Sequence, residues 1–402
     1  MITKINIDVL TTYVFRHLDF SDIDNVSRIN KIFWKICCNY NYKHQLFSNV
    51  TDKTYDPNYT RYREKIYLEI DVLDKPLNIR HKLEFVSISR VIEGIDLSAF
   101  NGTNKLYMQN SNIEDVSKLY NIHTLDLSNT NVKDVHTLGK VHTLNLSGTA
   151  VTDVSMLGGV YNLNLSGTQV TDVSALGNLH SLILDFTPVS DVSALGNVHT
   201  LYLFRTDITD VSALGNNHTL GLDYCYYITD VSSLGRVTNL SLRNLESITD
   251  VSALGNVHTL ILDDCWEVTD VSSLGGVTNL SLRNTPVIDV SALGSVDNLD
   301  LSFTNVSDVS MLYNVRTLNI NATEVDIVSM LNVETLGIID TSIIDVRDLP
   351  NLKEIHLKCD DDNFGFMKYD HNRYEKIISY ILKNDNVSFT SYYPNHMLLD
   401  ID

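Results

Sequence analysis

The sequence predicts an α/β solenoid, a right-handed coil with a parallel β-sheet on its concave face and a cap at each end. Two observations predict it. A phrase of about nineteen residues, typified by DVSALGNVHTL at 191–201 and again at 250–260, recurs along most of the chain. Each copy also contains an L-x-L triplet, whose alternation is that of a half-buried β-strand. One copy cannot bury its own apolar side, so stacked copies must share a continuous interior.

The first leucine of each L-x-L triplet gives the period. The step is nineteen residues, with twenty-residue steps between Leu220 and Leu280 and one eighteen-residue step to Leu336. The series runs through Leu106, Leu125, Leu144, Leu163, Leu182, Leu201, Leu220, Leu240, Leu260, Leu280, Leu299, Leu318 and Leu336, and Ile355 continues it. Leucines at set offsets with a period near the short end of 20–29 residues are typical of a leucine-rich-repeat solenoid.

The segment that returns from one strand to the next is short and has its own fixed positions. Valine follows the Asp in all thirteen full repeats, from Val116 to Val346, and leucine always stands three places later. We expect both to close the core on the wall opposite the strands. So short a period leaves room for one helical or 3₁₀ turn, not a full helix. The Asp itself is missing only at Ile327, and we interpret it as an N-cap of this turn, because the Gly-rich pattern of calcium-binding solenoids is absent.

Two further columns contain residues that could carry chemistry. The column after the strand is Thr in most repeats but Cys at Cys225 and Cys265, and we interpret it as a ladder bonded to the backbone of the neighbouring coil. A histidine column comprises His123, His142, His180, His199, His218 and His258. Tyr161 and Thr238 occupy the same position in other repeats, so the column accepts many side chains and does not predict a metal site. The sequence predicts no catalytic residue, no metal and no cofactor.

One zone of the array departs from the repeat phrase. Between Leu182 and Arg283 the outward positions carry aromatic and arginine side chains, and the twenty-residue steps lie in the same zone. The candidate protein-binding residues are Ile183, Phe186, Tyr202, Phe204, Arg205, Tyr224, Tyr226, Tyr227, Arg243, Trp266 and Arg283. Because Tyr, Trp and Arg anchor protein interfaces, we expect a protein substrate on the concave face. The alternative is that these aromatic side chains only pack on one another along the strand edges.

The charge of the chain excludes some partners. Asp and Glu number 50 against 30 Lys and Arg, a formal net charge of -20, which would repel a phosphate backbone or an anionic membrane. The start, MITKINIDVL, does not read as a secretory leader, and no stretch is long and apolar enough to predict a membrane span. The five cysteines show neither disulfide nor zinc spacing. We therefore expect reduced thiols and a cytoplasmic location.

The N-terminal segment predicts two helices with apolar faces. Their apolar residues are Leu10, Val14, Phe15, Leu18, Ile23, Val26, Ile29, Phe33 and Trp34. The order of Leu18-Asp19, Asp22-Ile23, Val26-Ser27, Lys31 and Phe33 resembles an F-box, although Ile5-Asn6-Ile7 stands where that family has Leu-Pro. The alternative is a plain helical cap for the solenoid.

The repeats resemble the same family. LDDCWEVTDVSSL at 262–274 is similar to the cysteine-containing leucine-rich repeats of F-box proteins. The whole chain thus resembles the F-box/leucine-rich-repeat family. Its richness in Asn, Ile and Tyr favours a large DNA virus or a protist as the source. A viral protein would then be located in the host cell. This resemblance implies a substrate-recognition subunit of a Skp–cullin–F-box ubiquitin ligase, with a Skp-type adaptor on the N-terminal helices. The alternative is a non-catalytic interaction scaffold.

We expect four segments in the chain. They are an F-box-like helical domain at 1–48, a linker and N-terminal cap at 49–82, the solenoid at 83–358 and a C-terminal cap at 359–402. In the C-terminal cap, NRYEKIISYILKN predicts a helix and NVSFTSYY a strand.

Overall fold

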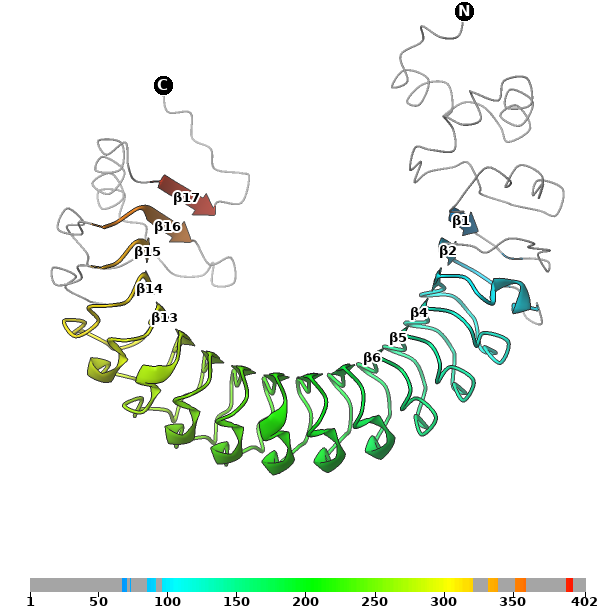
Figure 1. Ribbon diagram of the computed structural model, residues 1–402, viewed down its shortest axis with the longest axis horizontal. Helices are drawn as coiled ribbons and strands as arrows, with labels where there is room; N and C mark the ends of the chain where they lie inside the picture. Colours follow the sequence, from blue (N-terminus) through cyan, green and yellow to red (C-terminus); the bar gives the residue numbers. More distant parts are fainter. Residues whose placement is uncertain are drawn as a thin grey trace, which may run out of the picture. The chain divides into compact units, whose positions relative to one another are not determined.

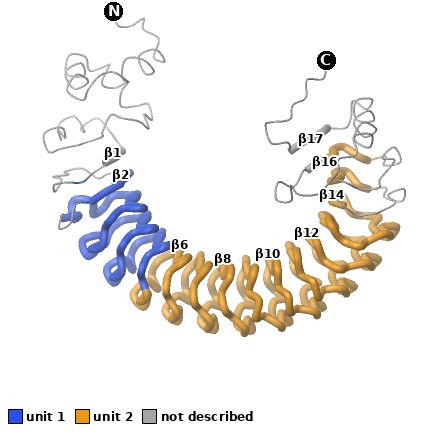
Figure 2. The backbone as a smooth tube through the Cα atoms, turned by 180° about the vertical axis from the view of Figure 1, so that it is seen from behind, with its two compact units in different colours: residues 1–151 blue, residues 152–402 orange. Residues whose placement is uncertain are grey.

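The structure is a computed structural model, and it describes residues 67–70, 73, 85–91, 96–320, 332–338, 351–358 and 388–392. Within these ranges the chain forms coils, each with one short strand followed by a return segment (Figure 1). The chain divides into two compact units, residues 1–151 and 152–402 (Figure 2). The predicted helices within 1–48 and the predicted helix of the C-terminal cap lie outside the described residues.

The described part of unit 1 contains five strands that pair in parallel, each with the next along the chain. Its elements are β1 (Tyr67–Ile70), β2 (Phe85–Ile88), η4 (Ser98–Phe100), β3 (Lys105–Tyr107), β4 (Thr124–Asp126) and β5 (Thr143–Asn145). The register follows the repeat, since Leu125 lies opposite Leu106 on one side and Leu144 on the other. Strand β1 lies in the segment predicted as a linker and cap, where no copy of the repeat phrase predicts a strand.

Unit 2 continues the same pattern with parallel pairing from β6 through β17. Its elements are β6 (Asn162–Asn164), η5 (Ser174–Leu176), β7 (Ser181–Ile183), η6 (Ser193–Leu195), β8 (Thr200–Tyr202), η7 (Ser212–Asn216), β9 (Thr219–Gly221), η8 (Ser232–Leu234), β10 (Asn239–Ser241), η9 (Ser252–Leu254), β11 (Thr259–Ile261), η10 (Leu274–Gly276), β12 (Asn279–Ser281), η11 (Ser291–Leu293), β13 (Asn298–Asp300), β14 (Thr317–Asn319), β15 (Thr335–Gly337), β16 (Glu354–Lys358) and β17 (Ser388–Tyr392). Strand β17 lies within the segment NVSFTSYY and pairs with β16, while the cap as a whole stays a prediction.

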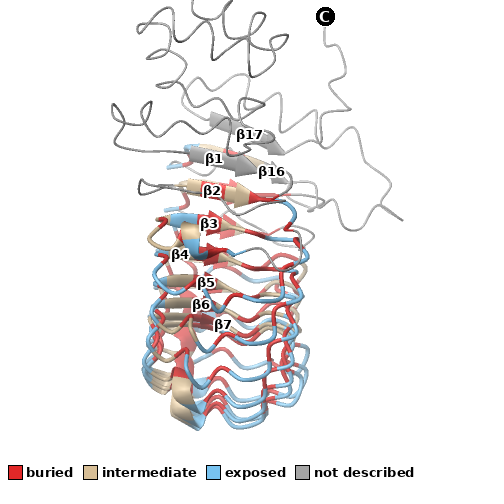
Figure 3. Ribbon diagram, turned by 90° about the vertical axis from the view of Figure 1, so that its right-hand side faces the viewer, coloured by how far each residue is buried: buried red, intermediate tan, exposed pale blue. Residues whose placement is uncertain are grey.

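The strands of unit 2 line the inner side of its curved stack (Figure 2), and their burial alternates as the L-x-L pattern predicts. In β8, for example, Leu201 is buried and Tyr202 faces outward, and Leu203 after the strand is buried again. Figure 3 shows the buried residues on the inside of each coil and the exposed residues on its outer turns. Strands β6 to β15 have only three residues each, and in most of these coils a turn begins directly after the second leucine.

The return segment is one 3₁₀ turn in most coils of unit 2, as predicted. In η5, Leu176 is buried and Ser174 begins the turn. The Asp172 carboxylate accepts a hydrogen bond from the Ser174 backbone N–H at 2.9 Å, and equivalent bonds recur in the other coils. The predicted hydrogen bond from the turn to the aspartate is therefore present, but the N-cap residue is Val173 and Asp172 stands one place before it. Hydrogen bonds from the Ser174 side chain and backbone lower the pKa of Asp172.

The glycine after this turn lets neighbouring coils approach closely. A Cβ atom added to Gly196 would lie 2.3 Å from the carbonyl oxygen of Ala213 in the next coil. The same close approach occurs at Gly177, where the distance to the oxygen of Ala194 would be 2.2 Å. In these coils the glycine of the L-G pair allows the close approach, although Tyr120 and Tyr313 occupy the same position in two other described coils.

The Thr and Cys column differs from the prediction in part. Thr187 does not reach the neighbouring coil, because its hydroxyl donates to Leu184 O of its own coil at 2.6 Å. The cysteines do reach it: the thiol of Cys225 donates to Leu203 O and that of Cys265 to Leu242 O, both at 3.0 Å. Only the two cysteines form the predicted contact with the neighbouring backbone, among the residues that the structure describes. No helix in that described part is long and apolar enough to cross a membrane.

Candidate functional site

A left-handed residue turns the chain away from the sheet after each of the strands β3 to β13. In several coils this position is glycine or asparagine, as at Gly167 and Asn284. Three consecutive coils of unit 2 have larger side chains there, Phe186 (φ 56°), Arg205 (φ 53°) and Tyr224 (φ 61°). A residue with a Cβ atom loses about 1–2 kcal/mol in this conformation, and only glycine and short polar residues adopt it routinely. The chain therefore accepts backbone strain in three coils in a row.

These residues come together in one group, which we call the aromatic cluster: Phe186, Phe204, Arg205 and Tyr224. The ring centroids of Phe186 and Phe204 are 4.9 Å apart, and those of Phe204 and Tyr224 are 5.0 Å apart. The Cζ atom of Arg205 lies 5.8, 5.6 and 5.3 Å from the centroids of Phe186, Phe204 and Tyr224. One guanidinium thus contacts three rings by cation–π interactions.

The aromatic cluster is open to solvent. Phe186 is 54% exposed and Arg205 is exposed, while Phe204 and Tyr224 are half-buried. Within the described residues, no carboxylate forms an ion pair with Arg205, and no hydrogen bond joins its guanidinium to another residue. Its N–H groups are therefore available to a bound molecule.

The acidic residues beside the cluster accept hydrogen bonds from backbone N–H groups. Asp185 accepts a hydrogen bond from the Phe204 N–H at 2.9 Å. Asp223 accepts one from the Arg243 N–H at 3.0 Å and one from the Ser241 hydroxyl at 2.5 Å. Burial raises the pKa of Asp185, against the opposing effect of the bond from Phe204. Both carboxylates tie one coil to the next.

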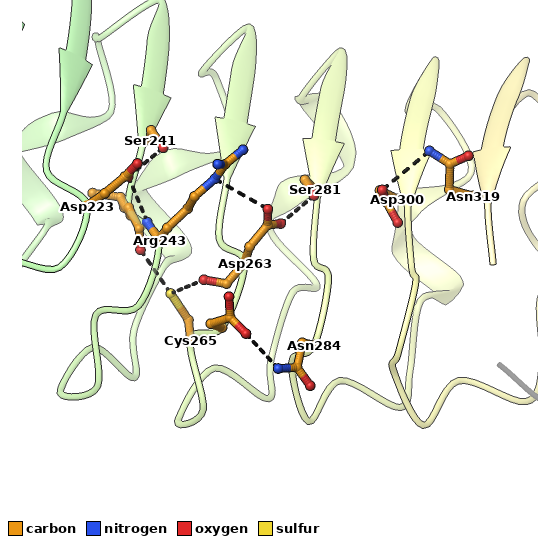
Figure 4. A network of polar contacts seen from close by, with 11 residues as sticks. Asp223, Ser241, Arg243, Asp263, Cys265, Ser281, Asn284, Asp300 and Asn319 are labelled. Atoms are coloured by element: carbon orange, nitrogen blue, oxygen red, sulfur yellow. Dashed lines mark hydrogen bonds and ion pairs between the residues drawn. The ribbon is translucent and has the colours of Figure 1, made fainter. Parts of the chain in front are cut away.

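The side chains of the other two predicted arginines have contacts outside the cluster. Arg243 Nε is 3.4 Å from Asp263 Oδ2, and the same carboxylate accepts a hydrogen bond from the Ser281 hydroxyl (Figure 4). Arg283 has its Cζ atom 4.9 Å from the centroid of Phe303. Arg243 therefore belongs to a polar network between coils, and Arg205 is the arginine of the cluster.

Tyr202 and Ile183 lie on the strand face. They stand opposite each other in β8 and β7. Tyr202 is 40% exposed, and its ring covers Gly221 of β9, where an added Cβ atom would meet Tyr202 Cδ1 at 2.7 Å. Gly221 is a residue that the sequence reasoning missed. Its signal was a glycine at the outward position of an L-x-L triplet.

The longer coils place three aromatic side chains outside the strand face. Tyr226, Tyr227 and Trp266 occupy an additional turn after the Cys position, and Tyr227 and Trp266 are 59% and 52% exposed. In one such coil this turn is closed by a hydrogen bond from Ile228 N to Cys225 O at 3.2 Å. Of the eleven predicted residues, only Ile183 and Tyr202 lie within strands, and the others lie in turns after them. The additional turn of the longer coils accommodates the twentieth residue.

Tyr226 extends the cluster and the other two do not. Its ring meets that of Tyr224 edge-on at 6.2 Å between centroids. No aromatic ring of the described residues contacts Tyr227 or Trp266. The structure therefore separates the predicted surface into the cluster with Tyr226, the strand pair around Tyr202, and two isolated aromatic side chains.

The histidine column forms a stack of exposed rings. His199 lies between His180 and His218, with centroids 4.6 and 4.5 Å away, and Tyr161 continues the stack beyond His180. Burial by the neighbouring rings lowers the pKa of His199, and repulsion from His218 and His180 adds to the effect. Within the described residues, no group of three or more His, Cys, Asp or Glu side chains could hold a metal ion.

Comparison with known proteins shows the fold. No model of a protein family matches the sequence, and no curated protein matches it. The structure is similar to an internalin, InlF, from Listeria monocytogenes, with 21% identity over 71% of this chain and 87% of that chain and a TM-score of 0.50. The leucine-rich-repeat protein LIC12759 of Leptospira interrogans has 14% identity over 81% and 89% of the two chains and a TM-score of 0.48. The functional domain of InlJ from Listeria monocytogenes, which includes a cysteine ladder, has 17% identity over 64% and 69% and a TM-score of 0.44. The repeat period and the likeness to InlF together show that this chain has the leucine-rich-repeat fold.

Proposed function

We propose that this chain is a non-catalytic module that recognises a protein, and that the aromatic cluster is its main contact. The observation that carries the proposal is the strain at Phe186, Arg205 and Tyr224. Asparagine or glycine would remove that strain, as in neighbouring coils, and Phe186 gains little burial in return. Backbone strain that the surrounding packing maintains without evident gain in stability favours a functional role.

Packing among the rings is the competing explanation. Each aromatic pair contributes about 0.5–1.5 kcal/mol beyond its burial, so the two close pairs recover about 1–3 kcal/mol of the roughly 3–6 kcal/mol of strain in the three coils. Ring packing therefore helps to explain why the cluster is tolerated but not why it is present. Exposed aromatic side chains with an arginine among them are the residue types that anchor protein interfaces, which supports recognition.

The experiment replaces Phe186, Arg205 and Tyr224 by asparagine in one variant of the full chain. We expect the thermal midpoint to stay the same or rise, because asparagine adopts positive φ at lower cost. Capture of the partner from extracts of the native cell, quantified by mass spectrometry, should fall at least tenfold, the size of a hot-spot effect. Phe303→Asn is the matched control, since Phe303 has φ 60° outside the cluster. A large fall in the midpoint with capture unchanged would instead favour packing.

The finer part of the proposal concerns residues 1–48, which lie outside the described residues. We propose that they dock on a Skp-type adaptor and make the chain the substrate-recognition subunit of a cullin-type ubiquitin ligase. The order of apolar and acidic residues from Leu18 to Phe33 and the cysteine-containing repeats support it. The alternative is an interaction scaffold whose N-terminal helices only cap the solenoid.

Co-purification of the full chain with a Skp-type adaptor separates these alternatives. The ligase proposal expects a complex that is lost in the variant Leu18→Asp/Phe33→Ala and kept in Trp266→Ala. If the wild-type chain and the adaptor elute separately, the ligase role fails. The proposed recognition by the repeats does not depend on that result.

A further inference from the structure

We infer that Arg205 makes the aromatic cluster selective for a protein segment in which a carboxylate is flanked by large apolar side chains. The inference rests on the proposed function, since it takes the cluster to be the contact surface. It specifies which chemical groups of the partner bind at that surface.

The geometry of Arg205 is that of an anion-binding guanidinium. Its Cζ atom lies between 5.3 and 5.8 Å from three ring centroids, so the rings hold the planar group in place. In the described part of the chain its N–H groups donate to no other side chain or carbonyl, and a guanidinium has five N–H donors and no acceptor. Two parallel N–H donors match the two oxygens of a carboxylate, which makes such pairs both strong and directional.

No carboxylate of the protein takes this place. Asp185 and Asp223, the acidic residues beside the cluster, accept hydrogen bonds from the backbone N–H groups of Phe204 and Arg243. Arg243 shows the opposite case, because Asp263 already neutralises it at 3.4 Å. In the described part of the chain, Arg205 is thus a cation held on an aromatic surface without an anionic partner.

The surroundings of Arg205 define what flanks the carboxylate. The exposed ring of Phe186 and the half-buried rings of Phe204 and Tyr224 border the guanidinium. Apolar side chains next to the carboxylate would cover these rings and exclude water from the ion pair, which strengthens it. A carboxylate without apolar neighbours would leave the rings exposed.

The charge of the whole chain restricts the partner further. A net charge of -20 repels any polyanion, which argues against nucleic acid and against a long acidic tract. That field is screened beyond about 8 Å at physiological salt, so one carboxylate in direct contact with Arg205 is not opposed by the distant acidic residues. The chemistry therefore fits an isolated Asp or Glu, or a chain-terminal carboxylate, within an apolar segment.

Selection of a random-peptide display library against the full chain tests this inference. We expect enriched peptides in which Asp or Glu adjoins Phe, Trp, Leu or Met. In fluorescence anisotropy with a synthetic enriched peptide, changing its Glu to Gln should weaken binding to the wild type about tenfold. The same change should matter less than about twofold for Arg205→Gln, because the ion pair is already absent there. Arg236→Gln, an exposed arginine of a return segment, is the matched control and should behave as the wild type.

The other outcomes separate the inference from the proposed function. The selectivity for a carboxylate is overturned if the enriched peptides are basic or uncharged. It is also overturned if they bind the Arg205→Gln variant as tightly as the wild type. If such peptides still lose binding to the triple asparagine variant, the proposed recognition surface stands. Peptides that bind the triple variant as well as the wild type, or a selection without enrichment, overturn both. Thermal midpoints within about 2 °C of wild type for each variant show that folding is intact.

Discussion

One column of residues shows how a single side chain changes the bonding between coils. Five places after the first leucine of a coil, threonine bonds its own backbone, as Thr187 does with Leu184 O. Cysteine at the same place bonds the previous coil, as Cys265 does with Leu242 O. The two cysteines occur in twenty-residue coils, so this contact accompanies the longer turn.

The reactivity of these cysteines follows from their burial. Desolvation raises the pKa of Cys265 to about 12 and also raises that of Cys225. Because the thiolate is the reactive form, we expect both thiols to resist alkylation in the folded protein at pH 8. Peptide mapping after iodoacetamide treatment measures each cysteine separately, and both should react within minutes in 6–8 M urea. Rapid alkylation of either one in the native protein would contradict the buried arrangement.

Asn217 is a polar residue in an otherwise apolar core column. It stands where the adjoining coils have Val198 and Val237 and is 1% exposed. Its Nδ2 donates to Leu195 O at 3.1 Å and to Val198 O, but its Oδ1 is buried without a hydrogen-bond partner. A buried acceptor without a partner costs about 1–3 kcal/mol.

We therefore expect Asn217→Val to raise the free energy of unfolding by about 1 kcal/mol. The change removes the unpaired oxygen and restores the apolar side chain of the column. Thermal unfolding followed by circular dichroism measures it, with Asn216→Val at the exposed neighbouring position as the control. A lower midpoint would mean that the two amide hydrogen bonds matter more than the unpaired oxygen.

At the scale of the element, contacts between return segments limit which residues a coil can have on that side. The 3₁₀ turn and the following glycine bring the backbone of one coil against the carbonyl of the next. The strand side tolerates an extra residue, because the additional turn closed by Ile228 N and Cys225 O holds it. Variation in this fold is thus concentrated on the turn after the strand, where Tyr226 and Tyr227 lie.

Substitution of the glycine tests that limit. Gly196→Ala places a Cβ atom 2.3 Å from the carbonyl oxygen of Ala213, and backbone cannot move aside as a flexible side chain can. We expect a loss of about 1–3 kcal/mol in the free energy of unfolding, the usual cost of overpacking. Asn197→Ala, at the exposed next position, should change it by less than about 0.5 kcal/mol. Equal midpoints for the two variants would show that the coils can separate freely.

At the scale of the whole molecule, the acidic column links stability to pH. Hydrogen bonds from the serine or histidine two places later hold the pKa of these aspartates below its ordinary value of 3.8. They are Asp96, Asp115, Asp134, Asp172, Asp191, Asp210, Asp230, Asp250, Asp270, Asp289 and Asp308. A carboxylate with a lowered folded pKa stabilises the fold above the unfolded pKa, and that contribution disappears as pH falls through the folded pKa. Half-buried Asp185 and buried Asp263, whose pKa is raised, act in the opposite sense but are fewer.

We expect the thermal midpoint to fall as the pH is lowered below about 4, despite the relief of repulsion within a chain of net charge -20. The variant Asp172→Asn/Asp191→Asn/Asp210→Asn keeps acceptors for the serine N–H groups but cannot titrate. Its midpoint should fall less between pH 5 and pH 3 than that of the wild type. Identical losses in both proteins would assign the acid sensitivity to other groups.

Much of the fold followed from the period alone, and less of the site did. The strand register, the 3₁₀ turn and the capping aspartates were predictable, because each depends on residues within one coil or on identical residues in the next. Strand β1 was missed because its sequence lacks the phrase. Of the predicted site residues, Arg243 pairs with Asp263 of the next coil, and nothing in the repeat pattern predicts that ion pair.

The sequence by itself determined that the chain stacks nineteen-residue coils, because a coil with two inward leucines can bury them only against its neighbours. Only the tertiary structure decided which exposed side chains share a surface. Phe186, Phe204 and Tyr224 meet because two of them stand at left-handed turns and one directly before such a turn. Contact between coils depends on those backbone angles, and a pattern of residue types does not contain them.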